Sequence, residues 1–599
     1  MNVEKKNQLI ERIKTLEGLT GEERSNLLDL LRTSYGLVWE DRPEEVEEHL
    51  REAMPVLIED KDKALTDGGP DAPNHVLIEG DNLEALTTLA YAHAGKIDVI
   101  YIDPPYNTGN KDFIYNDSFV DSEDGYRHSK WLSFMAKRLR IARKLLSDKG
   151  AIFISIDDNE QANLKLLCDE VFGADHFVCN FIWKSRQNKD NRNITGVSID
   201  HEYIFCYQKT VGCRAFIGAE RKTDGYQNPD NDPRGPWTSA NMAGLATESA
   251  RPNLHYDLID PHTGINYGRP QKGWRYDRNT MAKLIAENRI IWPDKPTGRP
   301  RKKSFLSEIS EVLPGFSSIV GVDVYTRNAT VEQNEIFNET RFDFPKPVRL
   351  IKELLKQTSS KDSFILDFFA GSGTTLHAVM HLNAEDGGHR QCILVTNNEN
   401  GICENVTYER NKRVIEGYTK PNGDRVEGLR TNNLRYYRID FVPRTQSPHD
   451  LRHLVELSTD MLCIKEDLYN PAEIDCNGKK IAKRYARRFQ KGDHEMIIIY
   501  EPKVIPFIVG HIKARDVKHE IKVYVNAPGR YAFDDDFSEV IDKITLCAIP
   551  DAILQAYLDV LPKAKDQELP PVNIDEDEIK KALEADSDYS YTDKKGGNL

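Results

Sequence analysis

Residues 97–116 of this chain read IDVIYIDPPYNTGNKDFIYN, and the rest of the chain is best understood around this stretch. The run 98–103, DVIYID, is short, apolar and rich in β-branched residues and tyrosine, which predicts a buried parallel strand. Pro104 and Pro105 follow; they fix φ and lack an N–H group, so the strand ends there and leaves carbonyls free to accept. A carboxylate, free carbonyls and the Tyr106 ring therefore meet at the carboxyl end of a strand, where open α/β sheets place their active sites.

The composition is that of a globular protein with several domains, because 599 residues are too many for one ordinary core. No apolar run approaches the roughly 18 residues that a membrane span needs, and the charged start MNVEKKNQ lacks the core of a signal peptide. The nine cysteines form no C-x-x-C pair, which favours a reducing compartment and no metal site. We therefore expect a cytoplasmic protein without membrane contact and without a bound metal.

Two parts of the chain alternate strands with helices. In the first part, HVLIEG (75–80) predicts a strand that ends at Asp81 and Asn82, which can cap a helix over 83–92. A helix over about 126–147 and strands at AIFISI and HEYIFCYQ follow. The pattern returns at Phe344 with a helix opened by Pro347 and a strand at SFILDFF. This alternation predicts an α/β fold whose parallel sheet carries helices on both faces.

The segment between these two parts, about 209–342, loses the alternation and is rich in Gly, Pro, Arg and Asn. Although the formal net charge of the whole chain is −15, residues 180–305 hold 21 Lys/Arg against 13 Asp/Glu. A local basic patch matters more for phosphate contact than the total charge does. Arg, Lys and Asn also suit base and phosphate contacts, so we expect DNA-binding residues here: Arg234, Trp237, Arg251, Lys272, Trp274, Arg275 and Arg278.

A glycine turn follows the strand SFILDFF directly, in the run Ala370-Gly371-Ser372-Gly373-Thr374-Thr375. Such a turn lets backbone approach a ligand closely. A Walker loop would need Lys-Ser/Thr after the second glycine, and a dinucleotide fingerprint would need a third glycine where Leu376 stands, so ATP and NAD are disfavoured. S-adenosylmethionine remains as the cofactor, and Glu399, at the end of the next predicted strand, is placed to hold its ribose.

Together, Asp-Pro-Pro-Tyr (103–106) and Phe-x-Gly-x-Gly (369–373) resemble the motifs of amino-methyltransferases that modify adenine N6 or cytosine N4 in DNA. The pocket motif precedes the cofactor motif, as in the beta group of these enzymes. The segments VLIEGDNLEAL, GAIFISIDDNE, DHEYIFCYQK and FDFPKPVRLIKELL resemble modification subunits of Type III restriction-modification systems, and the likeness covers about 37–442. The resemblance implies a Rossmann-like S-adenosylmethionine-dependent sheet of circularly permuted motif order, with an inserted target-recognition domain and a small α/β C-terminal domain.

On this basis we expect six parts of the chain. They are an N-terminal helical region for packing or dimer contact (1–70), the catalytic half of the methyltransferase domain (71–209), the target-recognition domain (210–342), the cofactor half (343–442), a C-terminal α/β domain (443–565) and an acidic, partly disordered tail (566–599).

The resemblance also implies roles for the site residues. Asp103 and the Pro104 carbonyl would accept hydrogen bonds from the target amino group, with Pro105 completing the turn, and Tyr106 would stack on a base that has left the duplex. The cofactor would be held by Asp81, Asn82, Lys346, Asp367, Phe368, Phe369, Gly371, Gly373 and Glu399.

Several alternatives differ in chemistry or in partners. Methylation at cytosine C5 needs a cysteine nucleophile, usually after proline, and the chain has no Pro-Cys. Cytosine N4 methylation shares the whole apparatus, but its enzymes more often carry Ser where Asp103 stands, so adenine in double-stranded DNA is preferred. By resemblance we expect a homodimer and an ATP-dependent restriction subunit as partners. A stand-alone methyltransferase and a DNA-reading subunit without activity are the remaining readings.

Overall fold

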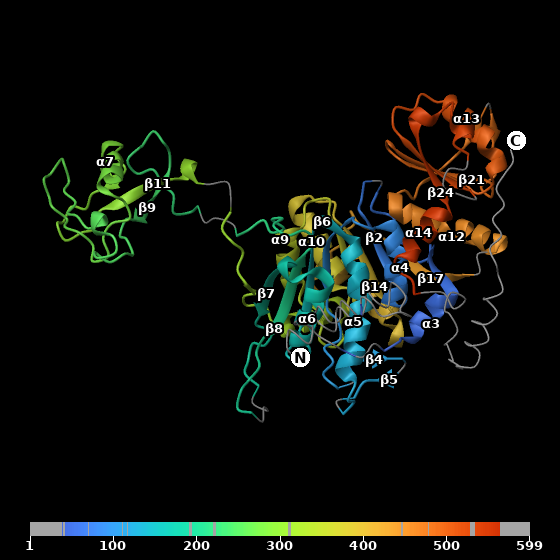
Figure 1. The fold of residues 1–599 in the computed structure, drawn as a ribbon, viewed down its shortest axis with the longest axis horizontal. Helices are drawn as coiled ribbons and strands as arrows, with labels where there is room; N and C mark the ends of the chain where they lie inside the picture. Colours follow the sequence, from blue (N-terminus) through green and yellow to red (C-terminus); the bar gives the residue numbers. More distant parts are fainter. Residues whose placement is uncertain are drawn as a thin grey trace, which may run out of the picture. The chain divides into compact units, whose positions relative to one another are not determined.

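The structure, a computed structural model, divides the chain into two compact units (Figure 1). The first comprises Met1–Ala215 and Ser318–Leu599, and the second comprises Phe216–Ser317. The residues it describes are 13, 39, 42–69, 71–110, 112–116, 118–121, 123–190, 195–219, 223–309, 313–444, 447–476, 478–527 and 533–562. Of the helical region predicted for residues 1–70, all of residues 1–41 except 13 and 39 lies outside the described residues, as does the whole acidic tail predicted for 566–599.

A ten-stranded sheet organises the first unit. In spatial order its strands are β1 (Ala53–Glu59), β17 (Asn433–Pro443), β2 (Asn74–Glu79), β14 (Gln391–Thr396), β13 (Phe364–Asp367), β3 (Ile97–Ile102), β6 (Leu146–Ile156), β8 (Glu202–Gln208), β7 (Phe177–Trp183) and β12 (Ile319–Val320). The pairs from β17 through β6 are all parallel. The predicted strands are therefore present, and the sheet confirms the predicted α/β class.

Two strands depart from the parallel sheet that we predicted. β8 runs antiparallel to both β6 and β7, and β1 runs antiparallel to β17. The connection from β7 to β8 contains no helix among its described residues, so the chain returns beside the strand it has just left, and a parallel neighbour would need a crossover. The helical region predicted for residues 1–70 also differs in its described part: α3 covers Glu45–Glu52, and β1, a strand, begins at Ala53.

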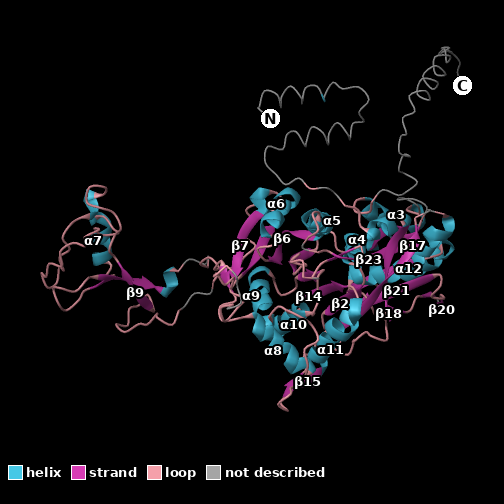
Figure 2. Ribbon diagram, turned by 90° about the horizontal axis from the view of Figure 1, so that it is seen from below, coloured by secondary structure: helices cyan, strands magenta, loops and turns pink. Residues whose placement is uncertain are grey.

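Helices cover both faces of this sheet, as Figure 2 shows. One face carries α4 (Asn82–Ala92), α5 (Arg127–Leu145) and α6 (Gln161–Phe172); the other carries α9 (Val348–Thr358), α10 (Thr374–Asp386) and α11 (Glu409–Glu416), with α8 (Thr326–Phe337) beside α11. The apolar stripe predicted for α5 is buried, including Trp131, Met135 and Leu139. Asp81 caps α4 by accepting the Leu83 N–H at 2.7 Å, as its place before the helix predicted.

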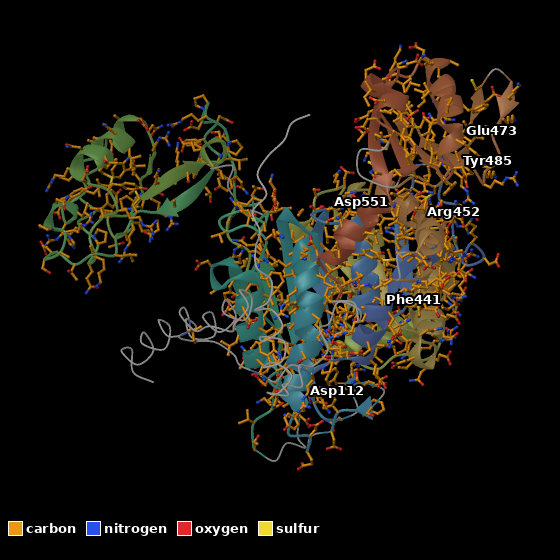
Figure 3. The ribbon with its side chains drawn as sticks, turned by 45° about the vertical axis from the view of Figure 1, so that its right-hand side comes forward. Asp112, Phe441, Arg452, Glu473, Tyr485 and Asp551 are labelled. Carbon is orange, nitrogen blue, oxygen red and sulfur yellow. The ribbon has the colours of Figure 1, made fainter. Side chains whose placement is uncertain are left out.

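The C-terminal part of the first unit forms a second, smaller sheet of order β18-β21-β22-β23-β24. Glu473 and Tyr485 mark this part in Figure 3, and Phe441 marks β17. Its elements are α12 (Pro448–Glu466), β18 (Pro471–Ala472), β21 (Ala486–Lys491), β22 (His494–Ile499), α13 (Ile505–Lys513), β23 (Ile521–Asn526), β24 (Ile544–Ile549) and α14 (Asp551–Leu558). Strands and helices are thus combined here, as expected for the α/β C-terminal domain predicted over 443–565.

The two sheets of the first unit share one hydrophobic core. Leu454, Met461 and Ile553 of the C-terminal part belong to the same buried cluster as Leu86 and Leu89 of α4. The Tyr557 hydroxyl donates to the Pro55 carbonyl at 2.7 Å, which ties α14 to β1. Since a fully buried aliphatic side chain stabilises by about 1.5–3 kcal/mol, this shared cluster fixes the C-terminal part on the large sheet.

The second unit is small and has its own core of Met242, Tyr256, Leu258, Trp274 and Met281. Among its described residues it contains a three-stranded sheet of order β10-β11-β9 and one α-helix; the bounds are β9 (Trp237–Asn241), α7 (Arg278–Ala286), β10 (Ile290–Ile291) and β11 (Arg301–Phe305). It is shorter than the recognition domain predicted for 210–342, because β12 and α8 (within 318–342) pack in the first unit. Among the described residues of both units, no helix is long and apolar enough to cross a membrane.

Candidate active site

The two sequence motifs meet at the centre of the large sheet. β3, which leads into Asp103, pairs in parallel with β13, which leads into the glycine turn; Ile365 lies opposite Val99. From β13 the chain continues to β14 on one side, and from β3 it continues to β6 on the other side. The order of the strands therefore reverses between β13 and β3, and ligands of open α/β sheets bind at the carboxyl ends of the strands at such a point.

Three polar side chains lie at Asp103: Lys346, Tyr106 and Glu202. With Asp103 they form what we call the Asp103 cluster. The Lys346 ammonium donates to both Asp103 oxygens at 2.7 Å. The Tyr106 hydroxyl lies 3.1 Å from Asp103 Oδ1 and 3.0 Å from Glu202 Oε2, and Lys346 Nζ lies 3.5 Å from that same Glu202 oxygen. Two carboxylates, one ammonium and one phenol thus form a single cluster.

Burial sets the ionisation of this cluster. Burial raises the pKa of Asp103, while the Lys346 ammonium acts in the opposite direction and limits the rise. Burial alone would lower the pKa of Lys346, but the Asp103 and Glu202 carboxylates outweigh it and raise that pKa. The lysine is therefore an ammonium, and it is the positive charge that favours a carboxylate at Asp103.

The Pro-Pro turn is held by a side chain from α5. Trp131 donates its indole N–H to the Pro105 carbonyl at 2.7 Å. The sequence predicted free carbonyls at this turn, and for Pro105 that prediction is wrong, because the buried indole needs an acceptor. The Pro104 carbonyl takes part in no hydrogen bond within the described part of the chain. It is therefore the carbonyl that a ligand could use.

The glycine turn owes its composition to close packing. Gly371 and Gly373 have φ of 46° and 73°, the left-handed region that favours glycine. A Cβ at Gly373 would lie 2.5 Å from Asn411 Nδ2, and one at Gly371 would lie 3.0 Å from the Phe342 ring. The Thr407 hydroxyl donates to the Gly371 carbonyl at 2.6 Å. The glycines are thus needed for the turn to sit against its neighbours, whatever ligand it holds.

Several predicted cofactor residues gather around this turn. The Asn82 amide donates to the Phe368 carbonyl at 2.9 Å, and Asp81 lies beside the buried Arg138. Asp367 accepts the Phe369 N–H at 3.0 Å, and burial raises the pKa of this carboxyl to about 7. The first turn of α10 lacks a side-chain cap, so its N–H groups and the helix dipole suit a carboxylate. This first turn is the part of the site that could hold the carboxylate in the amino acid part of S-adenosylmethionine.

Glu399 and Lys346 are the remaining predicted cofactor residues. Glu399 is exposed in a short 3-10 turn that follows β14, which ends at Thr396. Lys346, expected beside the cofactor, donates through its ammonium to Asp103.

Sequence reasoning missed three residues that hold the site in place: Glu202, Trp131 and Arg410. Arg410, fully buried on α11, donates to the Thr374 hydroxyl at 2.9 Å and so supports the glycine turn. Glu202 stands inside DHEYIFCYQ, which predicted only a strand. The direction of β8 explains why Glu202 reaches the site: because β8 is antiparallel to β6, the first residue of β8 lies at the edge of the sheet where β3 ends.

The predicted DNA-binding residues of the second unit differ in accessibility. Trp274 is buried, and its indole N–H donates to the Tyr256 carbonyl at 2.8 Å, so it is a core residue rather than a surface contact. Arg234 forms an ion pair with Asp232 at 2.7 Å. The indole N–H of the half-buried Trp237 donates to Asp230. Exposed side chains remain at Arg251, Lys272, Arg275 and Arg278.

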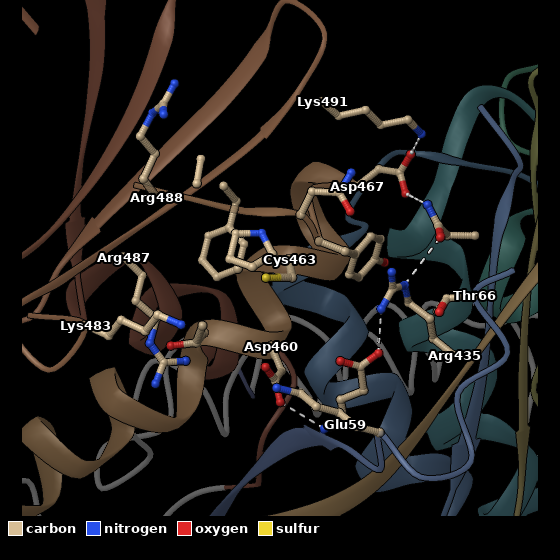
Figure 4. A pocket seen from close by; sticks show the side chains of 18 of the residues that line it. Glu59, Thr66, Arg435, Asp460, Cys463, Asp467, Lys483, Arg487, Arg488 and Lys491 are labelled. Carbon is tan, nitrogen blue, oxygen red and sulfur yellow. Dashed lines mark hydrogen bonds and ion pairs between the residues drawn. The ribbon is translucent and has the colours of Figure 1, made fainter. Parts of the chain in front are cut away.

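A cavity of about 940 Å³ lies between the β1–β17 edge of the large sheet and the C-terminal sheet (Figure 4). Charged side chains line it, and several are paired with one another: Arg435 with Glu59 at 2.6 Å and Lys491 with Asp467 at 3.2 Å. It contains none of the predicted site residues. We therefore regard this cavity as part of the junction between the two sheets.

Fold and site together define a class: an α/β methyltransferase sheet in which a central strand ends in Asp-Pro-Pro-Tyr beside a glycine turn. A sequence model of the family described as DNA methylase matches residues 97–420. The Mod subunit of the Type III restriction-modification enzyme StyLTI of Salmonella typhimurium is 33% identical over 68% of this chain and 70% of its own. The Type II methyltransferase M.KpnI of Klebsiella pneumoniae is 36% identical over 58% of this chain and 87% of its own.

Among solved structures, a DNA modification methylase of Thermus thermophilus complexed with S-adenosylmethionine is 16% identical, with a TM-score of 0.25 over 54% of this chain and 89% of that one. The family match and the Salmonella relative decide the assignment. The chain belongs to the N6/N4 DNA methylase family and is a homologue of Type III modification subunits. The predicted family and fold class are thereby confirmed.

Proposed function

We propose that this chain is the modification subunit of a Type III restriction-modification system, and that it transfers a methyl group from S-adenosylmethionine to adenine N6 in a specific double-stranded DNA sequence. The observation that carries the proposal is the meeting of the Asp103 cluster and the glycine turn at adjacent strand ends. A methyl donor on one side and an acceptor amino group on the other would face each other there.

The chemical difficulty lies in the acceptor. The lone pair of an adenine amino group is delocalised into the ring, so the nitrogen is a poor nucleophile. A carboxylate at Asp103 and the Pro104 carbonyl can each accept one N–H of the amino group, which orients the nitrogen and stabilises the positive charge that develops on it. A strong base is unnecessary, because the nitrogen becomes acidic only as the methyl group arrives. When bound, the cofactor supplies an electrophilic methyl group on a sulfonium.

Tyr106 would hold the target base once it has left the duplex. Its ring is half-buried, and its hydroxyl is fixed by Asp103 and Glu202. An aromatic stack is worth about 1–3 kcal/mol, and extruding a base costs a few kcal/mol. Tyr106 could offset much of that cost, and contacts from the second unit to the DNA backbone would supply the rest.

The preference for adenine rests on Asp103, where cytosine N4 enzymes more often have Ser. The ion pair between Lys346 and Asp103 is consistent with this preference for adenine. The ammonium favours the carboxylate form of Asp103, which is a strong hydrogen-bond acceptor. For partners we propose double-stranded DNA, a second copy of the chain and an ATP-dependent restriction subunit. The C-terminal sheet, which carries none of the site residues, is the part that we assign to subunit contact.

A stand-alone methyltransferase is the second candidate, and one observation favours it. The Klebsiella relative, a Type II methyltransferase, aligns over 87% of its own length. The two functions differ in whether a restriction subunit binds, so co-purification of the chain with the product of the neighbouring gene, analysed by size exclusion, separates them. A stable complex supports the Type III assignment, and two separate peaks support the stand-alone enzyme.

Expression in a host without DNA methylation, followed by single-molecule sequencing of its genome, tests the function itself. We expect N6-methyladenine at one consistent sequence motif, and no such signal in cells that express Asp103→Ala. Methylation at cytosine N4 would contradict the base assignment, and an unmodified genome would contradict the proposal as a whole.

A further inference from the structure

Glu202 is the member of the Asp103 cluster that no sequence motif predicted. It stands at the start of β8, at the edge of the sheet where β3 ends, and its carboxylate is largely buried, with a side-chain exposure of 19%. A second buried carboxylate beside Asp103 adds negative charge that one ammonium cannot neutralise. Burying such a charge costs free energy unless it is paired and hydrogen-bonded, so the groups that Glu202 contacts should explain its presence.

Most of the hydrogen-bond acceptor positions of the Asp103 carboxylate are already occupied by protein donors. A carboxylate offers about four lone-pair positions. Lys346 occupies one on each oxygen of Asp103, at 2.7 Å, and the Tyr106 hydroxyl lies 3.1 Å from Oδ1. Three of four positions are thus taken before any substrate is present. An amino group that must donate to Asp103 competes with these two donors.

Glu202 offers both competing donors a second acceptor. Its Oε2 lies 3.0 Å from the Tyr106 hydroxyl, which has one hydrogen to donate and two carboxylates to choose between. The same oxygen lies 3.5 Å from Lys346 Nζ, close enough for the ammonium to be shared after a small side-chain rotation. Neither donor would lose a partner if it turned from Asp103 toward Glu202.

We propose that Glu202 is a positioning residue of the methyltransferase site: it accepts the Tyr106 hydroxyl and shares the Lys346 ammonium, so that an oxygen of Asp103 is free for the target amino group. This inference rests on the proposed methyl transfer to an exocyclic amino group. Glu202 itself touches neither the target amino group nor the methyl group. It acts through the two side chains that it holds.

The inference predicts a specific kinetic pattern for Glu202→Gln. An amide keeps the shape of the side chain but accepts hydrogen bonds more weakly than a carboxylate. Because a hydrogen bond to a charged group is worth enough to change a rate by about 10- to 100-fold, we expect kcat to fall by that factor. KM for DNA and for S-adenosylmethionine should change less than about threefold, since neither ligand contacts Glu202.

The pH profile gives a readout that a purely structural role would not move. The Glu202 charge raises the pKa of Asp103, so its removal lowers that pKa and shifts the acid limb of kcat to lower pH. Glu202→Asp, which keeps the charge on a shorter side chain, should recover part of the rate and restore the acid limb.

Glu466→Gln is the matched control. Glu466, at the end of α12, accepts from the Tyr524 hydroxyl at 2.7 Å and from Lys522 at 2.6 Å, so it has the same two kinds of donor outside the active site. Glu466→Gln should leave kcat and the acid limb unchanged.

The experiment is steady-state and single-turnover transfer of labelled methyl groups to DNA by the full-length chain and these three variants between pH 5 and 9. DNA and S-adenosylmethionine are varied in turn, so that kcat and both KM values are obtained. An unchanged kcat or an unmoved acid limb in Glu202→Gln, while the wild type is active, overturns the inference alone. A lower kcat with the acid limb shifted down supports it. A wild-type chain that transfers no methyl group under any condition overturns the proposed function and the inference with it.

Discussion

Replacing Lys346 by methionine removes the ammonium that donates to Asp103 and keeps a side chain of similar length. In the structure the ammonium donates to both Asp103 oxygens at 2.7 Å, and the lysine is buried. An opposite charge at this range lowers a carboxyl pKa by about 1–3 units. Lys346→Met should therefore raise the pKa of Asp103, which burial has already raised, by about that amount.

Whether Lys346→Met raises or lowers the rate depends on which protonation state of Asp103 is active. Only the carboxylate accepts both hydrogen bonds well, so the rate falls as pH falls through the pKa of Asp103. In Lys346→Met the acid limb should move up by about 1–3 pH units, and below both limbs the rate should be about 10- to 1000-fold lower than in the wild type.

Single-turnover methyl transfer between pH 5 and 9 measures this shift, and Lys346→Arg, which keeps the charge, is the control. The family resemblance placed Lys346 beside the cofactor instead. An unmoved acid limb combined with a raised KM for S-adenosylmethionine would refute the reasoning and return Lys346 to the cofactor site.

Three further predictions concern the glycine turn, its neighbouring carboxyl and the second unit. In Gly373→Ala the new Cβ would lie 2.5 Å from Asn411, so we expect a loss of about 1–3 kcal/mol in stability and in cofactor affinity. Gly387→Ala is the control and should lose less, because Gly387 also has a positive φ, of 66°, but no atom within 4 Å of an added Cβ. Thermal melts compare the stabilities, and calorimetry compares the cofactor affinities. Burial raises the pKa of Asp367 from its unfolded value of 3.8 to about 7, so the folded state holds a proton that the unfolded state has lost between these pH values. The free energy of unfolding should therefore fall by about 1.4 kcal/mol per pH unit as pH rises from 3.8 to about 7. In Asp367→Asn the melting temperature should lose this pH dependence, and the same pH dependence in both proteins would count against the prediction. Combined alanine substitution of the exposed Lys272, Arg275 and Arg278 should weaken DNA binding and make the affinity depend less steeply on salt concentration. Trp274→Ala should instead unfold the second unit, because Trp274 is buried. If the salt dependence of DNA affinity is unchanged in the triple variant, these cations do not contact DNA.

Local patterns were enough to predict most of the large sheet and its two motifs. The strand that ends at Asp103 and the glycine turn at Gly371 and Gly373 could be located because Pro and Gly restrict the backbone in ways that a sequence displays. The strands that depart from the parallel order could not be predicted this way. The direction of β8 depends on its partner in space, and an alternating apolar pattern is the same in both directions.

Side chains that support the site were harder to predict than those that form it. Glu202, Trp131 and Arg410 lie far in the chain from the residues they contact, and each sits in a segment that reads as an ordinary strand or helix. Trp274 shows the opposite error: an aromatic residue among arginines suggests a nucleic-acid surface, but burial makes it part of a core. Partners across the sheet can be found only once the fold brings them together.

Incubation of the purified chain with double-stranded DNA and S-adenosylmethionine carrying a labelled methyl group tests the central claim most directly. Digestion of the DNA to nucleosides, followed by chromatography, locates the label. We expect the label to elute as N6-methyldeoxyadenosine with the wild type and to be absent with Asp103→Ala. Label in N4-methyldeoxycytidine, or equal transfer by Asp103→Ala, would contradict it.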